Sequence, residues 1–243
     1  MTDSPAASAA GLRFSGPPID MDMTEAVPDQ TRKSRLADAL DSWIVDHCLF
    51  RTFVNTRVEI APGIWRSGQP LPYQIRGMAR DGIRTIVNLR GPRDCGSYRR
   101  EAEACRRYGI TLVDITTKSR DAPKREVLRR LRQVLETAEQ PILFHCKSGS
   151  DRAGLMAALY LITHANRPAA EALKQLHWRY LHFRKSPTGV LDRFIEAYGE
   201  AHAREPIGLW DWVETVYDRK AVKASFTPSG LATIIVDRVL GRE

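Results

Sequence analysis

A cysteine and an arginine stand six positions apart in the segment HCKSGSDRAG, which runs from residue 145 to residue 154. As a thiolate, Cys146 would be a strong nucleophile. Arg152 carries a planar guanidinium that binds two oxygens of a tetrahedral anion at once. The small residues between them let successive backbone N–H groups turn toward an anion. These residue types in this order predict phosphoryl transfer through a cysteinyl-phosphate.

The flanking sequence predicts the elements that must position this loop. PILFH, just before the cysteine, is a continuous apolar run typical of a central parallel strand. RAGLMAALYLITHA, just after it, is apolar on nearly every side and predicts a buried helix. A loop between such a strand and helix lies at the carboxyl edge of the sheet, where α/β proteins bind ligands, and the helix N-terminus adds positive potential. We therefore expect the substrate to be bound by the rest of the loop, namely by His145, Lys147, Ser148, Gly149, Ser150 and Asp151.

Strand and helix patterns alternate along most of the chain and predict an α/β fold with a central, mostly parallel sheet flanked by helices. VEIAPGIWRSGQP predicts a β-hairpin that turns at Pro62-Gly63. Further strands are expected at 83–90 and 110–115, and helices at 71–82, at 98–109 and from Pro123 onward. After the loop only helical patterns remain, at 168–182, 188–202, 208–218 and 229–241.

These patterns divide the chain into three parts. Residues 1–30 are rich in Ala, Ser, Pro and Asp without apolar periodicity, so we expect them to be disordered. Helical spacing of apolar residues begins at Leu36, and we place a catalytic domain at residues 31–205. Residues 206–243 are expected to form a helical C-terminal extension packed on that domain.

Composition limits the class of protein. The 243 residues carry a net charge of +8, which favours an anionic substrate or partner. The four cysteines do not have the spacing of a zinc site, and no signal-peptide pattern precedes them, so we expect reduced thiols in a cytoplasmic protein without metal or cofactor. The longest apolar run, near Leu155, is too short to cross a bilayer.

The loop resembles the H-C-x5-R signature of cysteine-based protein tyrosine and dual-specificity phosphatases. GIWRSGQP, followed by GIRTIVNLRG, resembles the upstream half of the bacterial and atypical dual-specificity members, and the resemblance covers roughly residues 57–165. It implies the α/β fold of that family and metal-independent hydrolysis of phosphomonoesters. Cys146 would be the nucleophile, Arg152 the phosphate clamp, and His145 the support of the loop and thiolate. The substrate would be a protein phosphorylated on tyrosine or serine, or a phosphoinositide-like or inositol-phosphate-like anion.

Two residues of the loop depart from the usual pattern. The family commonly has Ser or Thr after the arginine, where a hydroxyl helps the cysteine to leave, and this chain has Ala153. Asp151 places a carboxylate inside the loop, as in bacterial and lipid phosphatases with a C-x4-D-R signature.

Cleavage of a phosphate ester also needs a general acid for the leaving oxygen. We favour Asp121, which lies in KSRDAPKRE just before the helix that leads to the loop. A helix cap would explain Asp121 equally well. Asp114 has the more usual sequence distance from the cysteine, and Asp151 is the third candidate.

Other readings of the sequence stay open. A non-catalytic phosphate-binding module and a rhodanese-like sulfurtransferase would also use a loop of this kind. If the basic residues Lys118, Arg120, Lys124 and Arg125 rim the pocket, they would favour substrates with more than one phosphate or a membrane-surface headgroup. A solvated helix face is at least as good an explanation for Arg129, Arg130 and Arg132. HWRYLHFRK, residues 177–185, interleaves aromatic and basic residues, but aromatics at helical spacing more often pack in a core. We therefore expect no nucleic-acid partner and only a structural role for His182.

Overall fold

The computed structural model of the chain describes residues 57–229. The segment 1–30, for which disorder was predicted, lies outside the described residues. So do the helical pattern that begins at Leu36 and nearly all of the pattern at 229–241.

The centre of the fold is a five-stranded sheet in the order β1-β2-β5-β3-β4. The strands are β1 (Val58–Ala61), β2 (Ile64–Gly68), β3 (Thr85–Asn88), β4 (Thr111–Asp114) and β5 (Ile142–Cys146). β1 pairs with β2 in antiparallel orientation, and all other neighbours are parallel. The hairpin turns at Gly63, whose φ of +75° is readily adopted by glycine. The predicted mostly parallel sheet and its leading hairpin are therefore confirmed.

The register of the parallel strands brings the carboxyl ends of β2, β5, β3 and β4 to one edge of the sheet. Gly68 at the end of β2 lies opposite Cys146 at the end of β5. On the other side of β5, His145 lies opposite Asn88, which in turn lies opposite Asp114 of β4. Residues far apart in the sequence thus meet at the carboxyl edge of the sheet, where α/β folds place their ligands.

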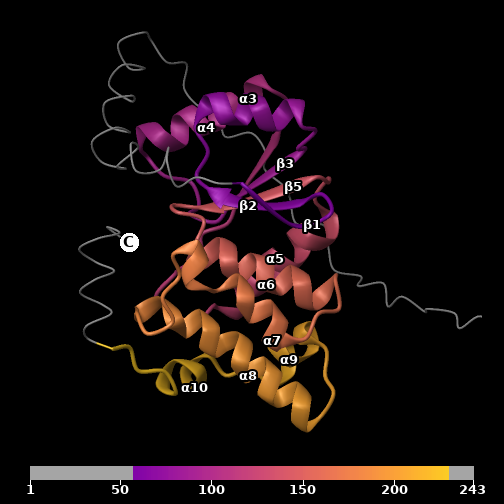
Figure 1. Ribbon diagram of the computed structural model, residues 1–243, viewed down its shortest axis with the longest axis vertical. Helices are drawn as coiled ribbons and strands as arrows, with labels where there is room; N and C mark the ends of the chain where they lie inside the picture. Colours follow the sequence, from indigo (N-terminus) through magenta and orange to yellow (C-terminus); the bar gives the residue numbers. More distant parts are fainter. Residues whose placement is uncertain (1–56, 230–243) are drawn as a thin grey trace, which may run out of the picture.

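Helices cover both faces of the sheet in layers (Figure 1). Of the helices within residues 57–229, α3 and α4 lie on one face, and α5 to α10 lie on the other, with α5 and α6 next to the sheet and the C-terminal helices beyond them. Their bounds are α3 (Pro72–Arg80), α4 (Gly96–Arg107), α5 (Arg125–Thr137), α6 (Asp151–Thr163), α7 (Ala169–Ala172), α8 (Val190–Arg204), α9 (Leu209–Thr215) and α10 (Arg219–Ala224).

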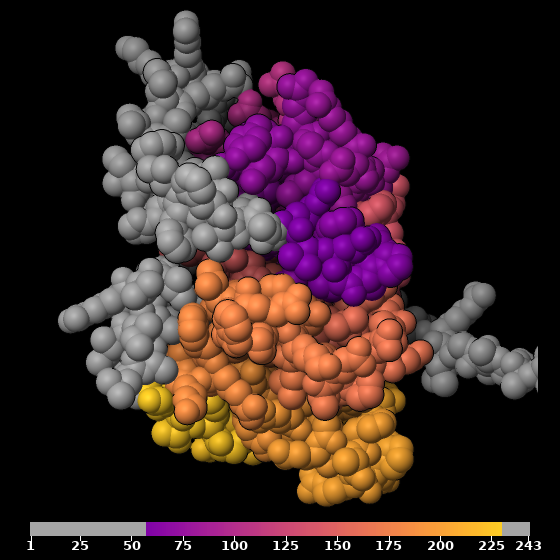
Figure 2. Space-filling view, in the orientation of Figure 1, coloured from indigo at the N-terminus to yellow at the C-terminus, as the bar shows by residue number. Residues whose placement is uncertain are grey.

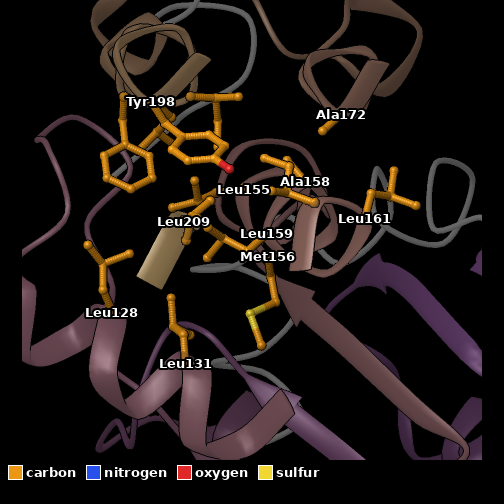
Figure 3. Close-up of a cluster of buried hydrophobic side chains, with 14 of the residues drawn as sticks. Leu128, Leu131, Leu155, Met156, Ala158, Leu159, Leu161, Ala172, Tyr198 and Leu209 are labelled. Atoms are coloured by element: carbon orange, nitrogen blue, oxygen red, sulfur yellow. The ribbon is translucent and has the colours of Figure 1, made fainter. Parts of the chain in front are cut away.

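Side chains that alternate along the strands pack into two separate hydrophobic cores, one on each face of the sheet. In β5, Phe144 points into the large core on the α5–α6 face, and its neighbour Leu143 points into the small core under α3 and α4. This is the two-residue period of a strand buried on both faces. Figure 3 shows the large core, where side chains of α5 such as Leu128 and Leu131 meet Met156 and Leu159 of α6.

The C-terminal helices belong to the large core. Phe194 of α8, Trp212 of α9 and the following Tyr217 pack with ring centroids 5.1–5.5 Å apart, mostly edge to face. In the space-filling view the orange and yellow residues of these helices form the lower part of the face and adjoin the residues before them (Figure 2). The extension expected at 206–243 is described as far as Ser229, and Val222 of α10 is buried in the same core.

The predicted helix at 168–182 is wrong. Only α7 and a short 3-10 turn at Leu173–Gln175 continue the helical path, and a second 3-10 turn follows at Trp178–Tyr180. Leu181 then adopts a left-handed φ of +62°. Trp178 is 69% exposed, so the expectation that the aromatic residues of this segment pack in the core fails for that residue. Contacts with β2 and α6, described below, determine the path of this segment.

Candidate active site

The predicted loop connects β5 to α6 at the carboxyl edge of the sheet. Cys146 is the last residue of β5, and α6 begins at Asp151. The Cys146 side chain is buried, whereas Lys147, Ser148 and Arg152 are half-buried. The sequence therefore placed the cysteine, the loop and the arginine correctly in the strand–loop–helix arrangement that presents N–H groups to an anion.

Gly149 packs so closely against β2 that no other residue fits. Its φ is +74°, and a Cβ atom there would lie 2.5 Å from the carbonyl carbon of Ser67 and 2.6 Å from the nitrogen of Gly68. Gly154, in the first turn of α6, meets a similar limit, because its Cβ would lie 2.7 Å from the carbonyl oxygen of Gln175. The two glycines let the loop and α6 approach their neighbours at backbone distance.

Arg66 of β2 supports the loop, although no local pattern in the sequence predicts a role for it. Its side chain is 2% exposed. Nη2 donates hydrogen bonds to the carbonyl oxygens of Gly149 and Ser150 at 2.6 and 2.9 Å. Nη1 donates to the main-chain oxygen and to Oε1 of Gln175 at 2.7 and 2.9 Å. The Tyr180 ring covers the guanidinium at 4.1 Å, a cation–π distance. One buried cation thus joins β2, the loop and the 3-10 segment.

The charge of Arg66 is expected to persist at neutral pH. Burial lowers the pKa of its guanidinium to about 10, and the charges of Tyr180, Cys146 and Asp151 oppose that decrease. A positive charge beneath the loop favours the binding of an anion there.

His145 lies behind the loop rather than in its mouth. Its ring is fully buried, with Nε2 2.6 Å from Oε1 of Glu101 on α4 and Nδ1 3.4 Å from the carbonyl oxygen of Cys146. Glu101 also accepts a hydrogen bond from Gln69, and Gln69 accepts one from Arg90. Because the His145 ring has no exposed surface, its position does not favour the predicted contact with a substrate. The position of the ring beside the main chain of Cys146 is instead suited to holding that residue in place.

Asp151 takes part in a buried chain of charges. Its Oδ1 lies 2.7 Å from Nδ1 of His182, and Nε2 of the same ring lies 2.6 Å from Oδ2 of Asp192 on α8. The exposed fractions are 5% for Asp151, 1% for His182 and 3% for Asp192. The sequence predicts only a structural role for His182, because nothing local shows its approach to Asp151, which depends on the irregular path of residues 173–182.

The two other candidates for the general acid have opposite surroundings. Asp121 pairs with Arg219 and Lys223 of α10, with the Lys223 nitrogen at 3.3 Å. Partial burial pushes the pKa of Asp121 upward, but the hydrogen bonds and charges of Lys223 and Arg219 outweigh it and bring the pKa below its usual value. Asp114 accepts hydrogen bonds from Tyr98 at 2.6 Å and from Asn88 at 2.7 Å. Burial raises the pKa of Asp114 above its usual value.

The basic stretch before and within α5 mostly serves the packing of helices. Arg125 donates to the carbonyl oxygens of Val213 and Tyr217, at 2.8 Å each. Arg129 forms a two-pronged pair with Glu214. Arg125 therefore holds α5 to α9, and the expectation that it rims the pocket is not supported.

Within residues 57–229, no group of three or more His, Cys, Asp or Glu side chains is arranged to hold a metal ion. In the same residues, no helix is both long and apolar enough to cross a membrane.

Ala153 is fully buried in the large core, directly after Arg152.

Comparison with known proteins identifies a phosphatase family. The model of the family described as "DSP-PTPase phosphatase fused to NAD+ Kinase" matches residues 48–187, more than half of the chain. The dual specificity protein phosphatase TpbA of Pseudomonas aeruginosa (strain UCBPP-PA14) is 29% identical over 119 residues, which cover 48% of this chain and 51% of TpbA. The chain thus spans about half the length of the curated relatives it matches.

Two solved structures are also similar. A crystal structure of P. aeruginosa TpbA aligns with a TM-score of 0.48 and 20% identity, covering 70% of this chain and 90% of that chain. A Cys-to-Ser variant of TpbA in complex with pTyr aligns with a TM-score of 0.48 and 23% identity, covering 62% of this chain and 91% of that chain.

Proposed function

The chain belongs to the family described as DSP-PTPase phosphatase fused to NAD+ kinase, and from this membership we propose that it hydrolyses phosphate monoesters through a phosphorylated cysteine. The observation that carries the proposal is the position of Cys146 at the end of β5, beneath a loop that Gly149 and Arg66 hold against β2 and that leads into the N-terminus of α6.

The reaction follows from that geometry in two displacements. The Cys146 thiolate attacks phosphorus, so that an S–P bond forms while the P–O bond of the ester breaks. The departing oxygen takes a proton from a general acid. Water then attacks the phosphocysteine, the S–P bond breaks, and inorganic phosphate leaves. Arg152 and the N–H groups of the loop bind the non-bridging oxygens in both steps.

We assign the general acid to Asp114 rather than to Asp121, which the sequence favoured. A group that donates a proton near neutral pH benefits from a raised pKa, which burial gives to Asp114. Asp121 is paired with two cations that favour its ionised form. Asp151 is 5% exposed and faces the buried ring of His182, whereas Asp114 is half-buried.

The proposed substrate is a phosphorylated protein, because the relative TpbA is named a dual specificity protein phosphatase. Phosphoinositides and inositol phosphates stay within the class of anions that the loop would accept. We also propose a cytoplasmic location, since Cys95, Cys105 and Cys146 are all free thiols in the described part of the chain. The division into a catalytic domain at 31–205 and an extension at 206–243 stays a prediction.

The test compares purified wild-type protein with Cys146→Ser and Arg152→Lys on an aryl phosphate and a phosphotyrosine peptide. We expect Cys146→Ser to abolish turnover while it still binds the peptide. Arg152→Lys should lose both affinity and rate, because an ammonium cannot reproduce the bidentate fork. Cys95→Ser, at a half-buried position outside the loop, is the matched control and should keep the wild-type rate.

Each rival reading has its own outcome in this experiment. Binding of phosphate esters without turnover by the wild type would identify a phosphate-binding module. Transfer of sulfur from thiosulfate to cyanide that depends on Cys146 would identify a sulfurtransferase. Hydrolysis by Cys146→Ser at the wild-type rate would overturn the proposal.

A further inference from the structure

The ring of His182 is held between two carboxylates in the interior of the protein. Nδ1 faces Asp151 at 2.7 Å, and Nε2 faces Asp192 at 2.6 Å. An ionised carboxylate only accepts hydrogen bonds, so each ring nitrogen must donate a proton. His182 in this arrangement is therefore an imidazolium that bridges α6 to α8.

The position of Asp151 makes this bridge relevant to the loop. Asp151 lies next to Arg152, at the first residue of α6, in the segment that would bind a phosphate dianion. A free carboxylate there would repel the dianion and compete for the guanidinium. In the structure the Asp151 side chain is almost completely buried and directed to His182.

We propose that His182 is a positioning residue of the phosphate loop, which keeps the Asp151 carboxylate buried and electrostatically neutralised so that the loop accepts an anion. This inference rests on the proposed function and adds to it how the loop tolerates its own acidic residue. His182 acts through Asp151 and does not touch the substrate.

The surroundings of the ring are consistent with this role. The charged groups that face it are Asp151 from α6 and Asp192 from α8, and the charge of Arg66 from β2 also acts on Asp151. Burial opposes a charge on the ring, but the hydrogen bonds and charges of Asp151 and Asp192 outweigh it and raise the pKa of His182 to about 9.

The segment that carries His182 supports the loop at three points. Gln175 accepts both hydrogen bonds from Nη1 of Arg66, and the Tyr180 ring covers the same guanidinium. His182 adds the bond to Asp151. The interruption of the predicted helix at 168–182 therefore matters for the loop. A continuous helix would not bring Gln175, Tyr180 and His182 to their partners there.

A cycle of variants tests the proposal: His182→Gln, Asp151→Asn and the double variant. The readouts are the dissociation constant of inorganic phosphate by calorimetry, KM and kcat for an aryl phosphate, and the melting temperature. His182→Gln keeps a polar side chain but removes the charge, so phosphate should bind about tenfold more weakly, the effect of one nearby unit charge. The double variant should bind phosphate as the wild type does, since it no longer contains the repelling carboxylate. His202→Gln, on the exposed surface of α8, is the matched control.

Recovery of phosphate affinity in the double variant would distinguish a positioning role from a loss of stability. The second substitution would not be expected to restore lost stability. Unchanged phosphate affinity in a folded His182→Gln protein would overturn the inference. So would a double variant that stays as weak as His182→Gln, or a wild-type protein that binds no phosphate at all. Wild-type protein that binds phosphate without hydrolysing esters would overturn the proposed function alone, because the affinities of the variants would still decide the role of His182.

Discussion

The backbone of Gly149 packs directly on the backbone of Ser67, so that a Cβ atom added to Gly149 would lie 2.5 Å from the Ser67 carbonyl carbon. This contact sets the position of the phosphate loop relative to β2. At Gly149 the fold needs both the conformational freedom of glycine and its lack of volume, whereas at Gly82 it needs only the conformational freedom.

Gly149→Ala should destabilise the fold and weaken phosphate binding, while Gly82→Ala should do much less. Both glycines have a left-handed φ, +74° and +86°, so both substitutions introduce roughly 1–2 kcal/mol of backbone strain. Only Gly149→Ala adds a steric clash, which raises its expected loss to roughly 2–5 kcal/mol, since no atom lies within 4 Å of a Cβ at Gly82. Urea unfolding and phosphate calorimetry of both variants measure the difference. Equal losses of stability would show that the clash is relieved by movement of the loop.

Arg66→Lys should lower both stability and activity, although it keeps the charge. An ammonium cannot span the carbonyl oxygens of Gly149 and Gln175 together, so buried acceptors lose their donors. Each such loss in the interior costs about 1–3 kcal/mol. We expect a drop of about 3 kcal/mol in the free energy of unfolding and a lower kcat/KM. Arg84→Lys, at an exposed position paired loosely with Glu139, is the control and should change little. A fully stable and active Arg66→Lys protein would refute the bracing role.

Asp114→Asn should slow hydrolysis of an alkyl phosphate far more than that of an activated aryl phosphate. A general acid contributes about 10²–10⁴-fold, and its loss matters most when the leaving oxygen is a poor leaving group. The same substrates on Asp121→Asn provide the comparison, and there we expect a loss of stability from the broken pairs with Arg219 and Lys223, without dependence on the leaving group. If the dependence appears in Asp121→Asn instead, the acid is the residue that the sequence favoured.

The stability of the protein should fall as the pH rises from about 6.5 to about 9, through the titration of His182. The pKa of this ring is raised to about 9 in the folded state from an ordinary value of 6.5, so folding favours the charged form. The resulting stabilisation is complete below the unfolded pKa and is lost as the pH passes the folded pKa, with a size on the order of 3 kcal/mol. Urea unfolding at about pH 6 and about pH 9.5 measures it. In His182→Gln this part of the pH dependence should vanish, whereas His202→Gln should retain it.

The sequence determined the elements around the loop because their signals are local. The apolar run before Cys146 and the apolar helix after it are readable within a few residues, and so is the turn at Gly63. The same locality explains the failure at 168–182. Helical spacing continued there in the sequence, but bonds to Arg66 and Asp151 from distant elements determined the backbone path.

For the candidate site, the sequence by itself predicted the nucleophile, the clamp and the loop between them, since all lie within seven consecutive residues whose chemistry follows from residue type. Only the tertiary structure decided what holds that loop in place. Arg66 lies 83 positions before Gly149, and His182 lies 31 positions after Asp151. Hydrogen bonds and charge interactions act over a few ångströms of space whatever the separation in sequence. No local pattern marks such partners, and the same reason moved the expected acid from Asp121, which α10 neutralises, to Asp114 on the edge strand.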